Sequence, residues 1–209
     1  MINTVITEDN LFMQNHLRRM LEEDGRFNVV SAVRDAAEAE EICKNRKIDL
    51  VLMDVQTLHN NSGLAAGERI KKRDNDIKVI IVTSLVDPEV LAKAKKGSAD
   101  SLWYKDHGKI ELMEVINRTL SGEKIFPDRS PNVELNNMFS DDISPRQLNI
   151  LRCFVKGMTY DEIAEELKLS KNGVRWNLEQ IVEKGGFKNK HEMLAAVIEN
   201  KLIITTLKE

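Results

Sequence analysis

The sequence predicts two folds in series: an α/β doubly wound parallel sheet of five strands over residues 1–121, and an all-α bundle over residues 143–209. Short apolar runs begin near Ile2, Phe27, Ile48, Ile77 and Ser101, and helical patterns separate them. Strands that alternate with helices are typical of a parallel sheet covered on both faces. From residue 143 onward the apolar spacing is helical throughout, which predicts a separate helical domain.

Capping residues and prolines indicate where several helices begin. Asp87-Pro88-Glu89 combines a capping side chain, a proline with a preset φ and an acid in the first turn. Residues 144–147 (Ser-Pro-Arg-Gln) and 159–162 (Thr-Tyr-Asp-Glu) read as capping boxes, and Ser170 can cap a third helix. The short turn before Ser170 predicts a helix-turn-helix. Residues 122–142 contain two prolines, three asparagines and little periodicity, so we expect a partly extended linker there.

Composition limits the class of protein. The chain has 209 residues and a formal charge of −3, which predicts a soluble protein with no general affinity for polyanions. No apolar run approaches the ~20 residues of a membrane span, and the N-terminus lacks the pattern of a signal peptide. Cys43 and Cys153 lie far apart in apolar patterns, as buried cysteines do in a reducing compartment. We therefore expect a cytoplasmic protein.

Polar side chains follow four of the strand-like runs. Glu8-Asp9, Asp54, Thr83 and Lys105 each stand where an apolar run stops. Because the carboxyl ends of parallel strands line one crevice, these groups are expected to converge. Oxygen ligands suit Mg²⁺, and a carboxylate such as Asp54 can attack a phosphoryl group once a cation neutralises the donor. Lys105 and Thr83 would then bind the phosphoryl oxygens.

Residues 1 to about 120 resemble a response-regulator receiver domain, and residues 143 to about 198 resemble the LuxR-type helix-turn-helix. Together they resemble the NarL/FixJ class of two-domain regulators. The matching residues of the second part are Ser144-Pro145-Arg146, Gly157, Glu162-Ile163-Ala164, Leu167, Ser170, Val174, Ile181 and Lys184.

The resemblance implies a flavodoxin-like fold for the first domain and a role for each polar group. It makes Asp54 the phosphoacceptor, Thr83 the switch hydroxyl and Lys105 the phosphate-pairing lysine. The implied Mg²⁺ ligands are Glu8, Asp9, Asp54 and the backbone carbonyl of Gln56. A sensor histidine kinase would donate the phosphoryl group, and activation would favour a homodimer.

The receiver part also departs from the family pattern. Thr57-Leu58 stands where Met-Pro is frequent, and the loop over residues 59–63 is one residue longer than usual. Leu102 occupies the position of a frequent aromatic switch residue, and Asp106 replaces a frequent proline. These changes leave the phosphorylation chemistry intact and concern how it is relayed.

The recognition helix is expected over about residues 171–184. Its apolar stripe leaves five residues facing outward for DNA: Lys171, Asn172, Arg175, Trp176 and Glu179. We expect Arg175 and Glu179 to form an i,i+4 pair in the free protein. This part departs from the family at Gly173, Asn177, Glu179 and Gly185, and its balance of charges is only slightly positive.

The function expected is a phosphorylation-dependent, DNA-binding transcription regulator, the output component of a two-component system. It is not expected to be an enzyme beyond slow self-dephosphorylation. The first alternative is a phosphorylation-controlled protein–protein binding module with weak or no DNA binding, favoured by Glu179 and Trp176. The second is a phosphatase-like enzyme, disfavoured because its motif needs an Asp where Gln56 stands.

Overall fold

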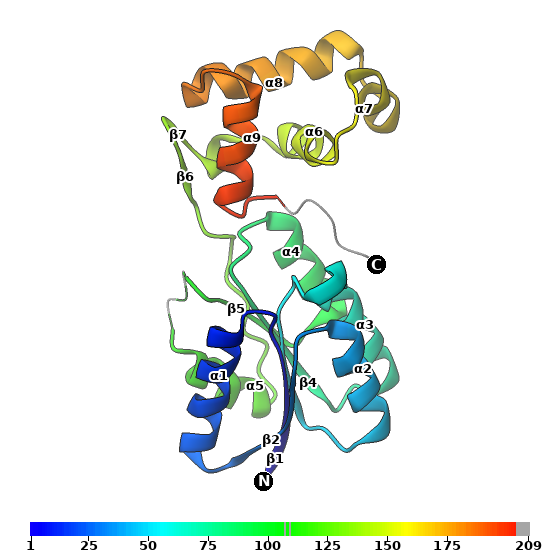
Figure 1. The fold of residues 1–209 in the computed structure, drawn as a ribbon, viewed down its shortest axis with the longest axis vertical. Helices are drawn as coiled ribbons and strands as arrows, with labels where there is room; N and C mark the ends of the chain where they lie inside the picture. Colours follow the sequence, from blue (N-terminus) through cyan, green and yellow to red (C-terminus); the bar gives the residue numbers. More distant parts are fainter. Residues whose placement is uncertain (107, 109, 204–209) are drawn as a thin grey trace. The chain divides into compact units, whose positions relative to one another are not determined.

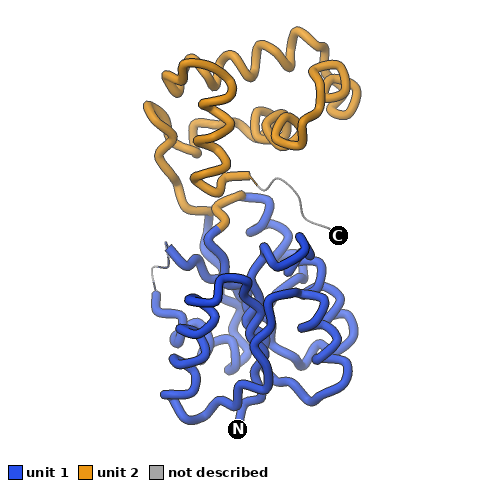
Figure 2. Tube along the Cα trace, viewed as in Figure 1, with its two compact units in different colours: residues 1–84, 88–129, 207–209 blue, residues 85–87, 130–206 orange. Residues whose placement is uncertain are grey.

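The computed structural model describes residues 1–106, 108 and 110–203, and the last six residues of the predicted second domain lie outside this part. The chain divides into two compact units (Figure 2). The first comprises residues 1–84 and 88–129, and the second comprises residues 85–87 and the described residues from 130 onward. The boundary at residue 130 falls inside the stretch expected to be a linker.

The first unit is the predicted doubly wound fold, with a parallel sheet in the order β2-β1-β3-β4-β5 (Figure 1). The strands are β1 (Ile2–Thr7), β2 (Phe27–Val33), β3 (Leu50–Met53), β4 (Lys78–Thr83) and β5 (Ser101–Tyr104). The helices are α1 (Leu11–Asp24), α2 (Ala36–Asn45), α3 (Gly63–Arg73), α4 (Pro88–Lys93) and α5 (Leu112–Leu120), with short helical turns η1 (Leu58–Asn60) and η2 (Ala94–Ser98). Figure 1 shows α1 and α5 on one face of the sheet and α2, α3 and α4 on the other.

Burial follows from that layering. The central strands β1, β3 and β4 are buried or half-buried at every position, because helices cover both of their faces. All four residues of β3 are fully buried. The strand order therefore brings the ends of β1, β3 and β4, with the polar residues that follow them, to one edge of the sheet.

The second unit is the predicted helical bundle, with a helix-turn-helix in it. Its helices are α6 (Pro145–Val155), α7 (Tyr160–Leu167), α8 (Lys171–Gly185) and α9 (Lys190–Glu199). Both expected capping boxes are present at Ser144 and Thr159, and Ser170 accepts a hydrogen bond from the backbone N–H of Gly173. In the described part of the chain, no helix combines the length and apolar character that crossing a membrane requires.

A small hairpin occupies the region where the sequence indicates little regular structure. Strands β6 (Glu134–Leu135) and β7 (Met138–Phe139) pair antiparallel, and a short turn, η3 (Ser140–Asp142), leads into α6. Leu135 and Met138 are buried in the core of the helical unit. Asn136 adopts a left-handed conformation with φ 58°, which asparagine tolerates well. Two-residue strands are too short to produce a visible periodicity, so the sequence pattern alone misses them.

Candidate functional site

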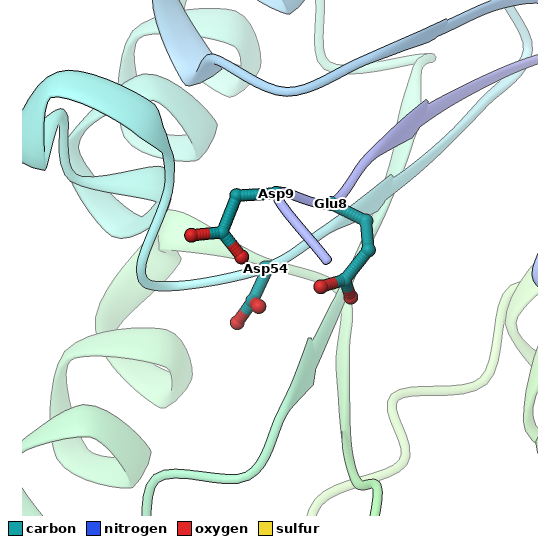
Figure 3. A group of neighbouring side chains, drawn as sticks. All are labelled: Glu8, Asp9 and Asp54. Carbon is teal, nitrogen blue, oxygen red and sulfur yellow. The ribbon is translucent and has the colours of Figure 1, made fainter. Parts of the chain in front are cut away.

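Three carboxylates meet at the carboxyl edge of the sheet. Glu8 and Asp9 follow β1, Asp54 follows β3, and the register pairs the last residues of these two strands, Thr7 and Met53. Each of the three side chains offers a carboxylate oxygen, and these oxygens lie within 4.8 Å of one another (Figure 3). Glu8 and Asp54 are buried, at 1% and 7% exposure, while Asp9 is partly exposed. The convergence expected for these residues is therefore present.

Lys105 supplies the positive charge of this cluster. Its ammonium donates to the Glu8 carboxylate at 2.5 Å and to Asp54 Oδ2 at 2.7 Å. The other Asp54 oxygen accepts from the backbone N–H of Val55 at 2.6 Å. Two buried carboxylates thus share one buried ammonium, which leaves the cluster with an excess of negative charge.

The pKa values of the cluster reflect its burial and its charges. Burial raises the pKa of Asp54 to about 6, with Glu8 adding to the rise, and Lys105 opposes it. Burial tends to lower the pKa of Lys105, but the charges of Asp54 and Glu8 outweigh it and raise that pKa. A second cation placed beside the carboxylates would favour the charged form of Asp54 and so oppose the effect of burial on its pKa.

Thr83 lies at the same edge as these groups. It ends β4, is fully buried, and its backbone carbonyl accepts from the N–H of Lys105 at 2.9 Å. Gln56 is exposed and forms an isolated backbone bridge with Ser62. The roles of the Thr83 hydroxyl and the Gln56 carbonyl toward a phosphoryl group and Mg²⁺ remain predictions.

Asp35 organises the loop beside the site, and the sequence analysis did not single it out. This buried carboxylate caps α2 and accepts hydrogen bonds from His59 Nδ1 at 2.8 Å and from Asn61 Nδ2 at 2.8 Å. Burial would raise its pKa, but the His59 hydrogen bond and others lower it. His59 and Asn60 both have φ near 60°. The loop is therefore held in a strained form by Asp35, and only its unusual length marks it in the sequence.

Gly63 allows α3 to begin directly against the backbone of Asp54. Its backbone N–H donates to the Val55 carbonyl at 3.0 Å. A Cβ at this position would lie 1.8 Å from the backbone oxygen of Asp54. Since no side chain fits into that space, glycine fixes the approach of the helix to the Asp54 backbone.

The second unit presents its predicted reading residues on the exposed side of α8. Lys171, Asn172, Arg175, Trp176 and Glu179 are all exposed, and the Trp176 side chain is 57% exposed. The opposite face of the helix is buried in the core of the unit. The exposed side of α8 has a shape that can enter the major groove of DNA. The base contacts of each residue remain predictions.

The expected pair of Arg175 and Glu179 is wrong. Within the described residues Arg175 forms no ion pair, and Glu179 instead lies 3.8 Å from the ammonium of Lys190 on α9. The Lys190 ammonium also lies over the Tyr160 ring, 5.1 Å from its centre. Tertiary packing brings α9 closer to Glu179 than the arginine one turn away, which a helical spacing rule cannot foresee.

Two departures of α8 from the family pattern have structural reasons. Asn177 is buried and donates from Nδ2 to the Gly173 carbonyl at 2.8 Å, so the polar group is satisfied inside the helix. A Cβ at Gly185 would lie 2.2 Å from the Phe187 ring. Gly185 thus makes room for Phe187, which packs into the core in place of a larger side chain on the helix.

The fold and the site together define a class: an α/β domain with a buried acidic site, joined to a helix-turn-helix domain. Comparison with known families agrees with this. Residues 4–117 match the Response regulator receiver domain family, and the chain belongs to it. Residues 141–197 match the family Bacterial regulatory proteins, luxR family. The chain is thus a response regulator with a LuxR-type DNA-binding domain.

Individual relatives have the same two-domain extent. The chain is 29% identical to the uncharacterized transcriptional regulatory protein YvfU of Bacillus subtilis, covering 96% of this chain and 98% of the relative. It is 27% identical to the oxygen regulatory protein NreC of Staphylococcus aureus, over 95% and 98% of the two chains. The solved structure of the RcsB–DNA complex is similar in fold, with a TM-score of 0.61, 20% identity, and 94% and 98% of the chains covered.

Proposed function

We propose that this chain is a phosphorylation-dependent regulator of transcription, in which a phosphoryl group on Asp54 controls DNA binding by α8. The observation that carries the proposal is the buried Asp54 carboxylate, held between Lys105 and the Val55 N–H with Glu8 and Asp9 beside it. Three carboxylates beside one lysine are more than a structural ion pair requires. A site that binds both a cation and a phosphoryl group requires such a surplus of carboxylates.

Mg²⁺ fits this site by the chemistry of its ligands. Glu8, Asp9 and Asp54 offer oxygens that lie within 4.8 Å of one another, and Lys105 supplies a single positive charge to two of these carboxylates. We propose that these three side chains and the Gln56 carbonyl hold the ion. When bound, the cation neutralises part of the charge on the phosphoryl donor.

The residues of the chain then perform the transfer. A carboxylate oxygen of Asp54 attacks phosphorus, an oxygen–phosphorus bond forms, and the bond from phosphorus to the nitrogen of a phosphohistidine breaks, leaving a neutral imidazole after it takes up a proton. Lys105 moves from the Asp54 carboxylate to a phosphoryl oxygen, and the Thr83 hydroxyl donates to another. The donor proposed is a sensor histidine kinase, so the function belongs in the cytoplasm, where kinase and DNA are both accessible.

The output is DNA binding by paired helical units. The exposed side of α8 carries Arg175 and Asn172, which suit guanine and adenine edges, and Trp176, which offers apolar contact. Because the charge of this region is only slightly positive, one unit should bind weakly. We propose that phosphorylation favours a homodimer that places two α8 helices on half-sites about one helical turn apart.

A direct test combines phosphorylation with DNA binding. The full chain is treated with Mg²⁺ and a small phosphodonor, and binding to duplexes selected from a random-sequence pool is measured before and after. We expect tighter binding and a dimer after phosphorylation in the wild type, and neither in Asp54→Asn. A phosphorylated chain that selects no duplex would instead favour the protein–protein binding module, with Trp176 in its interface.

A further inference from the structure

The segment that follows α5 is hydrogen-bonded to β5 at its first end. The N–H of Leu102 in β5 donates to the Ile125 carbonyl at 2.9 Å, and the Ile125 N–H donates to Ser101 Oγ at 3.0 Å. Ile125 also packs against the core of the first unit. Residues that follow α5 are thus paired with the edge strand of the sheet, where an unpaired strand would otherwise expose its backbone.

A chain of buried hydroxyls fixes this attachment. Ser101 Oγ and Thr119 Oγ1 are 2.7 Å apart, and Thr119 Oγ1 donates to the Val115 carbonyl at 2.6 Å. Since a carbonyl only accepts, the single hydroxyl proton of Thr119 is used there, and the proton between the two hydroxyls must come from Ser101. Ser101 therefore donates to Thr119 of α5 and accepts from the N–H of Ile125. Its side chain thus joins both segments to β5.

Strand β5 also leads directly into the candidate site. It has four residues, and Lys105, which follows it directly, binds Asp54 and Glu8. Leu102, which stands in place of an aromatic switch residue, is 1% exposed and has no ring to reorient. The backbone of β5 and the hydrogen bonds of Ser101 and Leu102 thus join Lys105 to Ile125.

The other end of the segment is hydrogen-bonded to the recognition helix. Asn136 Nδ2 donates to the carbonyls of Gly185, at 2.7 Å, and Gly186, at 3.2 Å, and the Asn137 N–H donates to the Gly185 carbonyl at 3.2 Å. These carbonyls lie at the C-terminal end of α8, where the helix has no partners of its own for them. A Cβ at Gly186 would lie 2.3 Å from the Asn137 amide, so the turn of the hairpin sits directly on the helix end.

We propose that residues 125–136 form a tether that transmits phosphorylation from β5 to the orientation of α8, with Ser101 and Asn136 as the positioning residues at its two ends. The inference rests on the proposed function and names its internal route. Both ends are held by hydrogen bonds within compact units, and only ten residues lie between them. A displacement of β5 therefore reaches α8 through the chain itself, without a change in either hydrogen-bonded end.

The main test lengthens the tether in the full chain. Four residues, Gly-Ser-Gly-Ser, are inserted between Ser130 and Pro131, which adds up to about 14 Å of reach. DNA affinity is measured with and without Mg²⁺ and beryllofluoride, on a duplex that the wild type selects. In the wild type we expect the phosphoryl mimic to raise affinity about tenfold or more, and in the insertion variant to raise it less than about twofold.

Substitutions test each end separately. Asn136→Gly keeps the left-handed backbone and removes the amide, whereas Asn136→Asp keeps the shape and replaces the donor by an acceptor. Both, and Ser101→Ala, should lower the gain in affinity caused by the mimic by about threefold or more. Asn132→Gly is the matched control, because Asn132 accepts hydrogen bonds from Ser140 and Asp141 and none from α8. It should keep the wild-type gain.

The outcomes separate the tether from the function on which it rests. Unchanged beryllofluoride binding and an unchanged melting temperature of the helical unit in every variant would show that the loss lies in transmission. A full gain retained by the insertion variant would overturn the tether and leave dimerisation of the first units as the relay. A wild type that selects no duplex, or gains nothing from the mimic, would overturn the proposed function itself.

Discussion

The two units expose their functional residues to opposite degrees. In the first unit Glu8 and Asp54 are 1% and 7% exposed, and Lys105 binds both. In the second unit the five candidate residues lie on the outer side of α8, and Trp176 is 57% exposed. The candidate site of the first unit is formed inside the fold. The candidate residues of the second unit lie on a surface where only a binding partner would bury them.

The difference has an energetic meaning. Removing one partner from a buried ion pair leaves a charge without compensation, which typically costs 3–5 kcal/mol, whereas an exposed pair contributes about 0–1 kcal/mol. Substitutions around Asp54 should thus change chemistry and stability together. Substitutions on the outer side of α8 should change binding and leave stability nearly untouched.

The largest effect expected is at Asp54. Asp54→Asn removes the nucleophile, so phosphorylation by a small phosphodonor with Mg²⁺ should disappear completely, as measured by intact mass. Asp49→Asn is a suitable control, because Asp49 directly precedes β3 and accepts from the N–H of Asn3 at the opposite edge of the sheet. Undiminished phosphorylation of Asp54→Asn would refute the assignment.

Gly63 tests whether the buried site depends on its backbone. Gly63→Ala places a methyl group against the Asp54 carbonyl, so the phosphorylation rate should fall by about tenfold or more as the site shifts. Gly67→Ala is the matched control on the same helix, because its Cβ would meet the Ser98 carbonyl at 2.3 Å, away from Asp54. Both variants should melt at lower temperature. Equal phosphorylation rates in the two would contradict the special role of Gly63.

Arg175 tests the exposed side of the comparison. Arg175→Ala should weaken binding to a selected duplex by about 1–3 kcal/mol, because a bidentate contact to a base or a phosphate contact is lost. The melting temperature should stay unchanged, since the residue is exposed and forms no ion pair within the described residues. Arg146→Ala, on α6, serves as the control of equal charge. If both variants bind as the wild type does, α8 is not the reading helix.

The pH dependence of Mg²⁺ binding reports on the burial of Asp54. Its pKa in the metal-free fold is about 6, above the ordinary 3.8. The contribution of protonated Asp54 to the free energy of unfolding is therefore lost as the pH rises from 3.8 to about 6. Below about pH 6 a proton competes with the metal, and affinity should fall up to about tenfold per pH unit. Above pH 7 the affinity for Mg²⁺ should not change with pH. Mg²⁺ titrations of the wild type and of Asp54→Asn at several pH values measure this dependence. An equal slope in both proteins would exclude Asp54 as its source.

The smallest effect is expected for the pair of Glu179 and Lys190. Their side chains are 54% and 27% exposed and 3.8 Å apart, so Glu179→Gln should change the unfolding free energy by less than about 1 kcal/mol. Glu179→Lys should raise general DNA affinity and steepen its dependence on salt, because it removes a repulsion and adds a phosphate contact. Binding titrations at several salt concentrations compare the two variants. A salt dependence of Glu179→Lys no steeper than that of Glu179→Gln would place position 179 away from the phosphates.

The sequence predicted those features that depend on strand ends and helix caps. Glu8, Asp54 and Lys105 stand directly after apolar runs, and parallel strands bring such positions together whatever the details of packing. The capping boxes at Ser144 and Thr159 are local, so they too were readable. Both predictions needed only neighbours in the chain and the topology of the sheet.

The features that were missed depend on contacts between distant residues. Asp35 meets His59 across 24 positions, and Asn136 meets Gly185 across 49. The pairing of Glu179 with Lys190 depends on the position of α9, and it replaced the local pair with Arg175. The hairpin at residues 134–139 has too few residues per strand to show alternation. These features depend on tertiary packing, which the residue pattern of a single sequence does not reveal.

The placement of the two tryptophans gives the molecule a pair of separate optical reporters. Trp103 belongs to β5, is partly buried, and its indole donates to the Ile110 carbonyl at 2.8 Å. Trp176 stands exposed on α8. The sequence has no other tryptophan. Iodide should therefore quench the emission of Trp176 far more than that of Trp103, and Trp176→Phe leaves a single tryptophan, on the strand that Lys105 follows. Tryptophan emission can thus follow changes at β5 and at α8 separately within one unlabelled chain.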